Sequence, residues 1–173
     1  MFANRSTSVL VATDVAARGL DIDALDMVIN VELARDSEIH IHRVGRTGRA
    51  GETGIAVSLV APGESQRARA VEELQKAPLN WQQYDQLTRK EGGKLLPPMT
   101  TLCIGSGRKD KLRPGDILGA LTGEAGIPGA QVGKIAIFDF QAYVAVERSI
   151  AKQALDRLNN GKIKGKSLRV RIL

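Results

Sequence analysis

The segment Val9-Leu-Val-Ala-Thr-Asp-Val-Ala-Ala-Arg-Gly-Leu-Asp21 begins with an apolar, β-branched run and continues directly into polar residues. A run of this kind predicts a buried parallel strand over Val9–Ala12. Ligands of α/β sheets bind beyond the carboxyl ends of the strands, and here a hydroxyl, two carboxylates and an arginine follow the strand. From the residues alone, a polar ligand-binding loop and an ordinary capped loop between Asp14 and Gly19 remain equally open.

Strand and helix patterns alternate over the rest of the first half. The runs Met27–Val31 and Gly54–Val60 predict two more strands, and helices are predicted over Ser37–Arg49 and Glu64–Lys76. Asp36 and Ser37 are the candidate N-caps of the first helix, which we expect to end near Gly51. This alternation predicts an α/β domain with a parallel sheet. Three strands make a thin sheet, so we expect a truncated domain.

Three arginines recur at a spacing of three in His42-Arg-Val-Gly-Arg-Thr-Gly-Arg49. At this spacing their side chains would project from one side of the helix end, and guanidinium groups match the oxygens of a phosphate chain. The alternative is a solvated basic helix end, stabilised by the helix dipole. Two glycines inside a helix cost about 1 kcal/mol each, which favours a functional role.

The segment Arg89-Lys-Glu-Gly-Gly-Lys-Leu-Leu-Pro-Pro98 combines paired glycines and prolines with charge. It predicts an exposed linker, 89–98, between a domain over 1–88 and a domain over 99–173. The elements predicted beyond it are Thr100–Ile104 (strand), Arg113–Thr122 (helix), Lys134–Phe138 and Ala142–Glu147 (strands), Ser149–Asn159 (helix capped by Ser149 and ended by Gly161) and Leu168–Ile172 (strand). This order predicts an α+β sandwich of the ferredoxin-like type.

The basic charge of the chain lies entirely in its second half. The net charge is +6, and the 25 Lys and Arg face 19 Asp and Glu. Residues 1–98 hold 12 basic and 13 acidic side chains, net −1, whereas residues 99–173 hold 13 and 6, net +7. This asymmetry favours a polyanionic partner, and the alternative is a basic surface that serves solubility.

Other features of the chain bear on its compartment. The single cysteine, Cys103, cannot form an internal disulfide, and the first eight residues lack the apolar core of a signal peptide. The longest strongly apolar stretch, Ile55–Ala61, is too short to span a bilayer. We therefore expect a cytoplasmic protein without a membrane segment.

Two of these segments carry a resemblance to a known family. The loop over Ala12–Asp21 resembles motif V of the DEAD-box RNA helicases, and His42–Arg49 resembles their motif VI. Ser37-Glu-Ile-His-Ile-His42 leads into the second motif as it does in that family. The resemblance covers about the first 60 residues and implies a partial RecA-like helicase C-terminal domain.

The resemblance implies nucleotide-binding roles for three residues. Asp21 matches the aspartate that contacts the ribose, and Arg46 and Arg49 match the catalytic arginine fingers at the γ-phosphate of ATP. The chain contains neither a Gly-x-x-x-x-Gly-Lys-Thr loop nor an Asp-Glu-Ala-Asp sequence. The phosphate cradle and the Mg²⁺ carboxylates of a complete enzyme would belong to an N-terminal RecA-like domain, a partner that this sequence lacks. ATP and Mg²⁺ are therefore expected not to bind tightly, and the chain alone is expected not to hydrolyse ATP.

The same resemblance implies contacts with RNA. Thr13 and Gly19 match positions that touch the RNA backbone, and His42 and Arg43 match residues that couple the ATP site to RNA.

The second half resembles the C-terminal domain of one bacterial subfamily of these helicases, the DbpA type. The matching segments are Leu95–Ile104, Gly107–Asp116, Gly129–Lys134 and Gly161–Lys166. The resemblance implies an RRM-like domain that binds a hairpin of 23S ribosomal RNA and acts in assembly of the large ribosomal subunit. The alternative is a catalytically inactive rRNA-binding module left by truncation.

The expected strand surface of such a domain carries few aromatic residues. An ordinary RRM stacks bases on aromatic side chains of its central strands. Tyr143 stands at one such position, but Gln141, Val146 and Cys103 stand at others. We therefore expect weak stacking, on Tyr143 alone at about 1–3 kcal/mol. Tyr143 as an ordinary half-buried strand residue remains the alternative.

Basic residues gather in two segments of the second half, and we predict that they bind RNA. They are Arg108, Lys109, Lys111 and Arg113, then Lys162, Lys164 and Lys166, followed by Arg169 and Arg171. If the two segments converge, they would contact the phosphates of a folded hairpin. The alternative is that these lysines only solubilise two loops.

Overall fold

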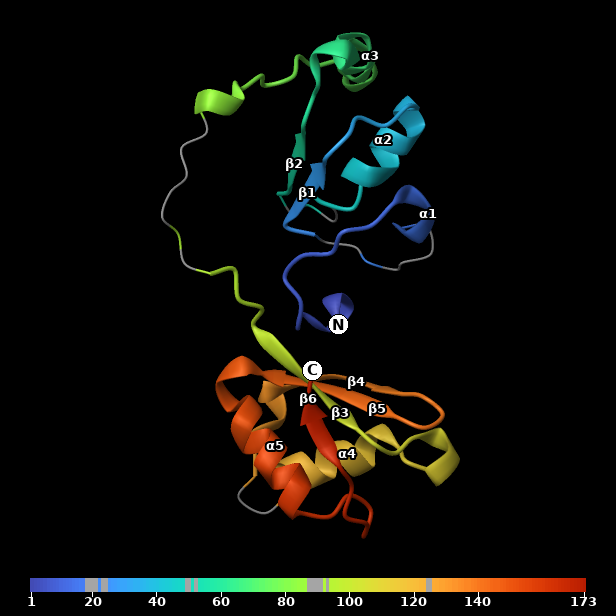
Figure 1. Ribbon diagram of the computed structural model, residues 1–173, viewed down its shortest axis with the longest axis vertical. Coiled ribbons are helices and arrows are strands. Elements are labelled where there is room, and N and C mark those ends of the chain that lie inside the picture. The colour runs from blue at the N-terminus through green and yellow to red at the C-terminus, as the bar shows by residue number, and fades with distance from the viewer. Residues whose placement is uncertain are drawn as a thin grey trace. The chain divides into compact units, whose positions relative to one another are not determined.

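The computed structural model divides the chain into two compact units (Figure 1). The structure describes residues 1–17, 22, 25–48, 51, 53–86, 92, 94–123 and 126–173. The first unit comprises Ala12–Gly92, and the second unit comprises Gly93–Leu173 together with Met1–Val11. None of the helices in these described ranges is long and apolar enough to cross a membrane.

The first unit contains a small parallel sheet with helices beside it. Strand β1 (Met27–Asn30) pairs with β2 (Ile55–Ser58), with Met27 opposite Ile55. The helices of this unit are α1 (Asp14–Ala17), α2 (Ser37–Val44) and α3 (Ser65–Gln75). This α/β arrangement was predicted, but the strands are not buried, because Ile29 is 58% and Ile55 54% exposed. Only two strands pair in the described part of this unit, so each of them has one edge without a paired strand there.

The predicted strand over Val9–Ala12 is wrong. These residues adopt no strand, and Val11 is 92% exposed. The sequence placed residues 1–11 in the first domain, but in the structure they belong to the second unit and contact its strand β3. The Met99 amide donates to the Arg5 carbonyl at 3.2 Å, and the Ser6 hydroxyl lies 2.6 Å from that of Thr101. A strand forms only where a ladder partner is available.

The helix predicted over Ser37–Arg49 is shorter than expected. Asp36 is its N-cap, as predicted, and accepts a hydrogen bond from the Glu38 amide at 2.7 Å. The helix ends at Val44, because Gly45 caps it and Gly48 adopts a left-handed φ of 64°. Both glycines therefore lie outside the helix, and the prediction that they lie within it was wrong.

The second unit has the predicted βαββαβ order. Its elements are β3 (Met99–Ile104), α4 (Pro114–Thr122), β4 (Val132–Ile137), β5 (Ala142–Glu147), α5 (Ala151–Asn160) and β6 (Val170–Ile172). The strands form one antiparallel sheet in the order β4-β5-β3-β6. Both helices cover one face of this sheet (Figure 1). The opposite face carries Cys103 and Tyr143, and Ser6 of the N-terminal segment lies against it at Thr101.

The core of the second unit lies between the sheet and its helices. Leu102, Ile104 and Val144 pack there with Ile117 of α4 and Leu158 of α5. Strand residues alternate between the two faces, so the neighbours of these core residues point to the open face.

Local capping explains where the helices of the second unit begin and end. Pro114 occupies the first turn of α4, and the Asp116 carboxylate accepts from the Arg113 amide at 2.9 Å. The predicted cap Ser149 is wrong, because a 3-10 turn over Arg148–Ile150 precedes α5 and makes Ile150 the N-cap. Gly161 ends α5, as predicted.

Candidate functional site

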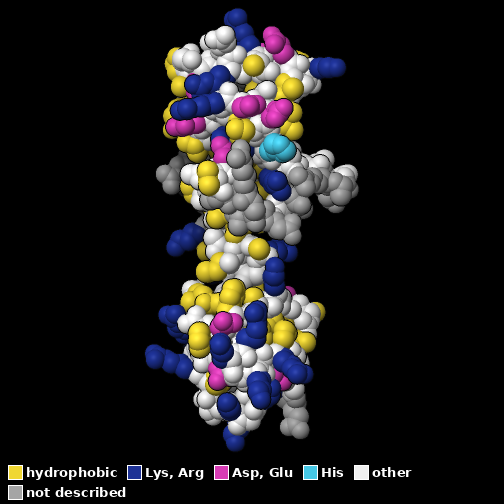
Figure 2. All heavy atoms as spheres, turned by 90° about the vertical axis from the view of Figure 1, so that its right-hand side faces the viewer, with side chains coloured by type: hydrophobic (Ala, Val, Ile, Leu, Met, Phe, Trp, Pro, Cys, Tyr) yellow, Lys and Arg dark blue, Asp and Glu magenta, His cyan; other side chains and the backbone are white. Residues whose placement is uncertain are grey.

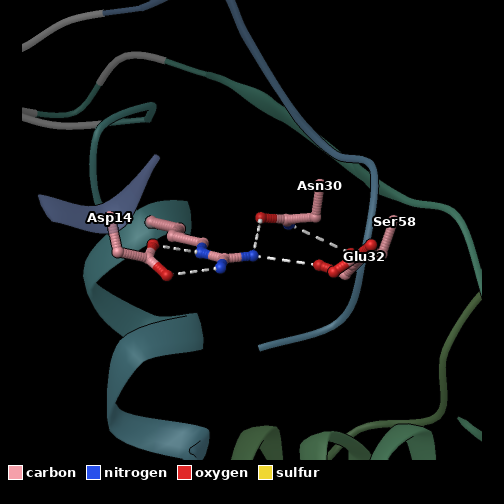
Figure 3. Close-up of polar contacts among 5 residues, drawn as sticks. Asp14, Asn30, Glu32 and Ser58 are labelled. Carbon is pink, nitrogen blue, oxygen red and sulfur yellow. Dashed lines mark hydrogen bonds and ion pairs between the residues drawn. The ribbon is translucent and has the colours of Figure 1, made fainter. Parts of the chain in front are cut away.

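A bidentate ion pair joins α1 and α2 in the first unit (Figure 3). The Arg43 guanidinium donates from Nε to Asp14 Oδ1 and from Nη2 to Asp14 Oδ2, both at 2.7 Å. Paired charge-assisted hydrogen bonds of this kind fix the orientation of both side chains. The predicted coupling residue Arg43 is thus tied to the segment that resembles motif V. The sequence indicated Asp14 either as one of the two carboxylates of a ligand-binding loop or as the start of a capped loop, and it did not predict this ion pair.

The same guanidinium also binds the end of the small sheet. Its Nη1 donates to the Glu32 carbonyl at 3.0 Å and to Asn30 Oδ1 at 3.3 Å, while the Asn30 amide donates to Ser58 Oγ at 3.1 Å. The hydrogen bond with Asp14 raises the pKa of Arg43, and this effect outweighs burial, which lowers it. One cation therefore connects α1 and α2 with the ends of β1 and β2.

The loop that follows α2 holds Arg46 in a defined place. The Leu25 amide donates to the Arg46 carbonyl at 3.0 Å, and the Thr47 hydroxyl donates to the Leu25 carbonyl. Gly54 lies so close that a Cβ there would be 2.0 Å from Thr47 Oγ1. Arg46 is half-buried and lies beyond the helix end, so the predicted row of three arginines on one helix face is wrong.

The remaining predicted residues of this unit are only partly described. Asp21, Gly19 and Arg49 lie outside the described residues. Thr13 is exposed directly before α1, and His42 is exposed in the last turn of α2. The part of the chain that the structure describes contains no group of three His, Cys, Asp or Glu arranged to hold a metal ion.

His40 is a buried histidine between α2 and α3. It is 4% exposed, its Nε2 lies 3.3 Å from Gln75 Nε2, and its Nδ1 has no hydrogen-bond partner among the described residues. Burial lowers the pKa of His40, and the nearby positive charge of Arg43 lowers it further. The folded unit therefore favours the neutral form of the His40 imidazole.

We expect the first unit to lose stability as the pH falls from about 7.5 to 6. The unfolded chain takes up a proton near pH 6.5, whereas folded His40 takes it up only at lower pH, so acidification favours unfolding. The measurement is urea unfolding at several pH values, followed by the fluorescence of Trp81, the only tryptophan. His40→Gln should remove this pH dependence, and His42→Gln, on the exposed side of the same helix, should keep it. An unchanged pH dependence in His40→Gln would contradict the assignment.

In the second unit, the two predicted basic segments converge. The Lys164 ammonium donates to the Lys111 carbonyl at 2.6 Å and lies 3.8 Å from Asp116. Both lysines adopt left-handed backbone conformations, with φ of 59° at Lys111 and 52° at Lys164. The basic side chains of these loops are exposed: Arg108, Lys109, Lys111, Arg113, Lys162, Lys164 and Lys166. The structure therefore brings together the two segments whose convergence the sequence left open.

Asp110 stabilises the first basic loop, which carries Arg108, Lys109, Lys111 and Arg113. The Asp110 carboxylate accepts from the Ser106 hydroxyl at 3.0 Å and from the Gly107 amide at 3.4 Å. These hydrogen bonds, the Ser106 bond first, lower the pKa of Asp110. The positive charge of Lys166 in the second loop lowers this pKa further, which again indicates that the two loops lie close together.

The open face of the sheet carries further cations and one of the predicted aromatic residues. Cys103 pairs with Tyr143 on one side and with Arg171 on the other, and Arg169 and Arg171 are both exposed. Tyr143 is half-buried, and its hydroxyl donates to Gln141 Oε1 at 2.7 Å. Figure 2 shows Lys and Arg side chains spread over one face of the second unit among few acidic ones.

Sequence reasoning missed two aromatic residues beside this face. Phe138 is 56% and Phe140 71% exposed, and the Phe138 ring meets Tyr143 edge to face at 5.6 Å. A signal was present, since three of the six aromatic residues in the chain fall within residues 138–143.

Comparisons with known proteins match one family to each half of the chain. Residues 101–172 match the DbpA RNA binding domain, and residues 1–51 match the helicase conserved C-terminal domain. The Escherichia coli ATP-dependent RNA helicase DbpA is 53% identical over 99% of the chain, and its Bacillus subtilis counterpart is 33% identical over 93%. The Bacillus subtilis DEAD-box ATP-dependent RNA helicase CshA is 49% identical over 43% of the chain and 15% of its own length.

A helicase C-terminal domain joined to an RNA-binding domain defines the C-terminal part of an RNA helicase. The chain belongs to the bacterial DEAD-box RNA helicases of the DbpA type and corresponds to their C-terminal part. It spans 37% and 38% of the length of the two DbpA relatives.

Proposed function

We propose that the RRM-like second unit binds a hairpin of 23S ribosomal RNA and brings the helicase to the assembling large ribosomal subunit in the cytoplasm. The observation that carries this proposal is the junction of the two basic loops, where Lys164 Nζ lies 2.6 Å from the Lys111 carbonyl. Cations from loops far apart in sequence, gathered on one surface, match the phosphates of a folded RNA. The βαββαβ order and the strand order β4-β5-β3-β6 support the RRM-like assignment.

The test is binding of the 173-residue chain to a hairpin from the peptidyl-transferase region of the large-subunit RNA. A scrambled hairpin of equal length is the control, and both are measured across a salt series. We expect a preference of at least about tenfold that persists at moderate salt. Specific recognition adds contacts to the bases and the RNA shape, and salt weakens these less than the attraction to phosphates. Equal binding to both RNAs that disappears as salt rises would contradict the proposal.

For the first unit, we infer that Asp21, Arg46 and Arg49 contact ATP in the complete enzyme. Arg46 is the one of these residues in the described part of the chain, and its loop is held by Leu25. A guanidinium on a fixed loop is suited to stabilising charge on a transferred phosphoryl group. The Mg²⁺ carboxylates would come from the N-terminal RecA-like domain.

We therefore expect no ATP turnover by the pure chain. In the complete enzyme we expect RNA-stimulated turnover, which Arg46→Ala should lower by roughly 10³-fold. Arg67→Ala, an exposed arginine on α3, is the matched control and should leave turnover unchanged. ATP turnover by the chain alone, abolished by Arg46→Ala, would contradict this assignment. The measurement is phosphate release at saturating RNA.

A second candidate function is an rRNA-binding module without catalytic role. The exposed apolar strand residues of the first unit favour it, because Met27 is 47% and Ile55 54% exposed. Turnover by the complete enzyme separates the two candidates. Hairpin binding together with turnover that Arg46→Ala leaves unchanged would support the binding module.

A further inference from the structure

Two exposed phenylalanines lie at the turn between β4 and β5. Phe138 is 56% and Phe140 71% exposed, although phenylalanine normally contributes to a core. Beside them lies an open pocket of about 600 Å³, lined by Arg108, Phe138, Asp139, Phe140 and Gln141. Exposed aromatic rings beside an arginine offer a surface on which a base can stack.

The walls of this pocket are held in place. Gly107 approaches the turn between β4 and β5 so closely that a Cβ there would lie 2.3 Å from the Phe138 carbonyl oxygen. The approach lets the Arg108 amide donate to that oxygen at 2.7 Å, and the Arg108 guanidinium donate to the Ile137 carbonyl at 3.0 Å. Tyr143 fixes the other side, since its ring meets Phe138 edge to face. The pocket is therefore formed before any ligand binds.

A second, smaller pocket adjoins the first. It measures about 270 Å³ and is lined by Cys103, Gly105, Gln141, Arg169 and Arg171. Gln141 lines both pockets, so they form one continuous surface with aromatic rings at one end and two arginines at the other. Stacking platforms beside cations are what single-stranded nucleic acids bind.

We propose that these two pockets hold unpaired nucleotides of RNA, with a base stacked on Phe140 and the adjoining phosphates at Arg108, Arg169 and Arg171. The net charge of +7 in residues 99–173 favours a polyanion over an apolar protein segment as the occupant. The proposal rests on the proposed RNA binding by the second unit. It adds a site for a single strand beside the basic loops that would bind the hairpin.

The test uses the full chain and an unstructured RNA of about ten nucleotides with one 2-aminopurine. Binding should quench the 2-aminopurine fluorescence, because the base stacks on an aromatic ring. Phe140→Ala should abolish the quenching and lower the affinity roughly 5- to 100-fold, while Phe140→Trp should retain both. Tyr84→Ala is the control, because Tyr84 is an 85% exposed aromatic residue of the first unit. Gly107→Ala, whose Cβ would clash with the backbone of Phe138 and Asp139, should weaken binding as well.

The same variants are also measured with the rRNA hairpin, with and without a single-stranded extension. Phe140→Ala should weaken only binding of the extended hairpin. Equal affinities of Phe140→Ala and the unaltered chain for the unstructured RNA would overturn the site, even where the hairpin is bound specifically. Loss of hairpin preference with intact stacking on Phe140 would instead contradict the proposed function and leave this site supported.

Discussion

Replacing Lys162, Lys164 and Lys166 together by glutamine is expected to lower the affinity for the rRNA hairpin roughly 10²-fold near 0.1 M salt. All three side chains are exposed on the loop before β6, and Lys164 brings this loop to Lys111 of the other basic segment. Each phosphate contact contributes about 0.7–0.9 to the slope of log affinity against log salt. Loss of three contacts should therefore reduce that slope by about 2 to 3.

The control for this variant must remove the same charge elsewhere. Arg67, Arg69 and Lys76 are exposed on or just after α3 of the first unit, and their replacement by glutamine lowers the net charge equally. We expect this variant to bind the hairpin within about twofold of the unaltered chain, because long-range attraction is screened beyond roughly 10 Å at 0.1 M salt. Equal losses in both variants would show that net charge, rather than the loop surface, determines binding.

The second unit could be predicted well because its signals are local. The β5 strand has the predicted bounds, Ala142–Glu147, since alternation of side chains between two faces is visible in a short window. Pro114 and Asp116 set the start of α4 through the chain immediately around them. The convergence of the basic loops was left open by the sequence, because it depends on the pairing of β3, which precedes the first loop, with β6, which follows the second.

The first unit was harder to predict because its structure depends on distant partners. The run Val9–Ala12 has strand propensity, but a strand also needs a neighbour in the sheet. The loop that follows α2 is held by Thr47, whose hydroxyl donates to the carbonyl of Leu25, 22 residues away. The ion pair of Arg43 with Asp14 spans 29 residues and leaves no local trace in the sequence.

The exposed phenylalanines were missed by the sequence prediction for a different reason. The usual stacking positions on the central strands include Tyr143, but they do not include Phe138 or Phe140. Whether an aromatic side chain is buried or exposed depends on the turn that carries it, and periodicity does not specify that. Only the structure shows that both rings border a pocket with Arg108.

Arg43→Ala is expected to lower the free energy of unfolding of the first unit by about 2 kcal/mol. The substitution removes both hydrogen bonds to Asp14 and leaves Asn30 Oδ1 and the Glu32 carbonyl without this donor. Because Arg43 and Asp14 are about one-third exposed, at 27% and 35%, the loss should be smaller than for a fully buried pair. The measurement is urea unfolding followed by Trp81 fluorescence.

Arg67→Ala is the matched control, since Arg67 forms an exposed ion pair with Glu64 three residues away. Its loss should cost less than about 1 kcal/mol. A double-mutant cycle of Arg43→Ala with Asp14→Ala isolates the pair itself, and we expect a coupling energy of about 1–2 kcal/mol. Additive effects would show that Arg43 stabilises the unit through its other contacts alone.

Arg43→Lys separates stability from coupling between the two motifs. A lysine keeps the positive charge but cannot bind both oxygens of Asp14 and the sheet end at once. In the complete enzyme, we expect this variant to keep most of its affinity for RNA and to lose much of the stimulation of ATP turnover by RNA. The physical reason is that the guanidinium is the observed link between the segment that resembles motif V and the helix that leads to Arg46. Unchanged stimulation in Arg43→Lys, with the expected loss of stability, would leave Arg43 a structural residue only.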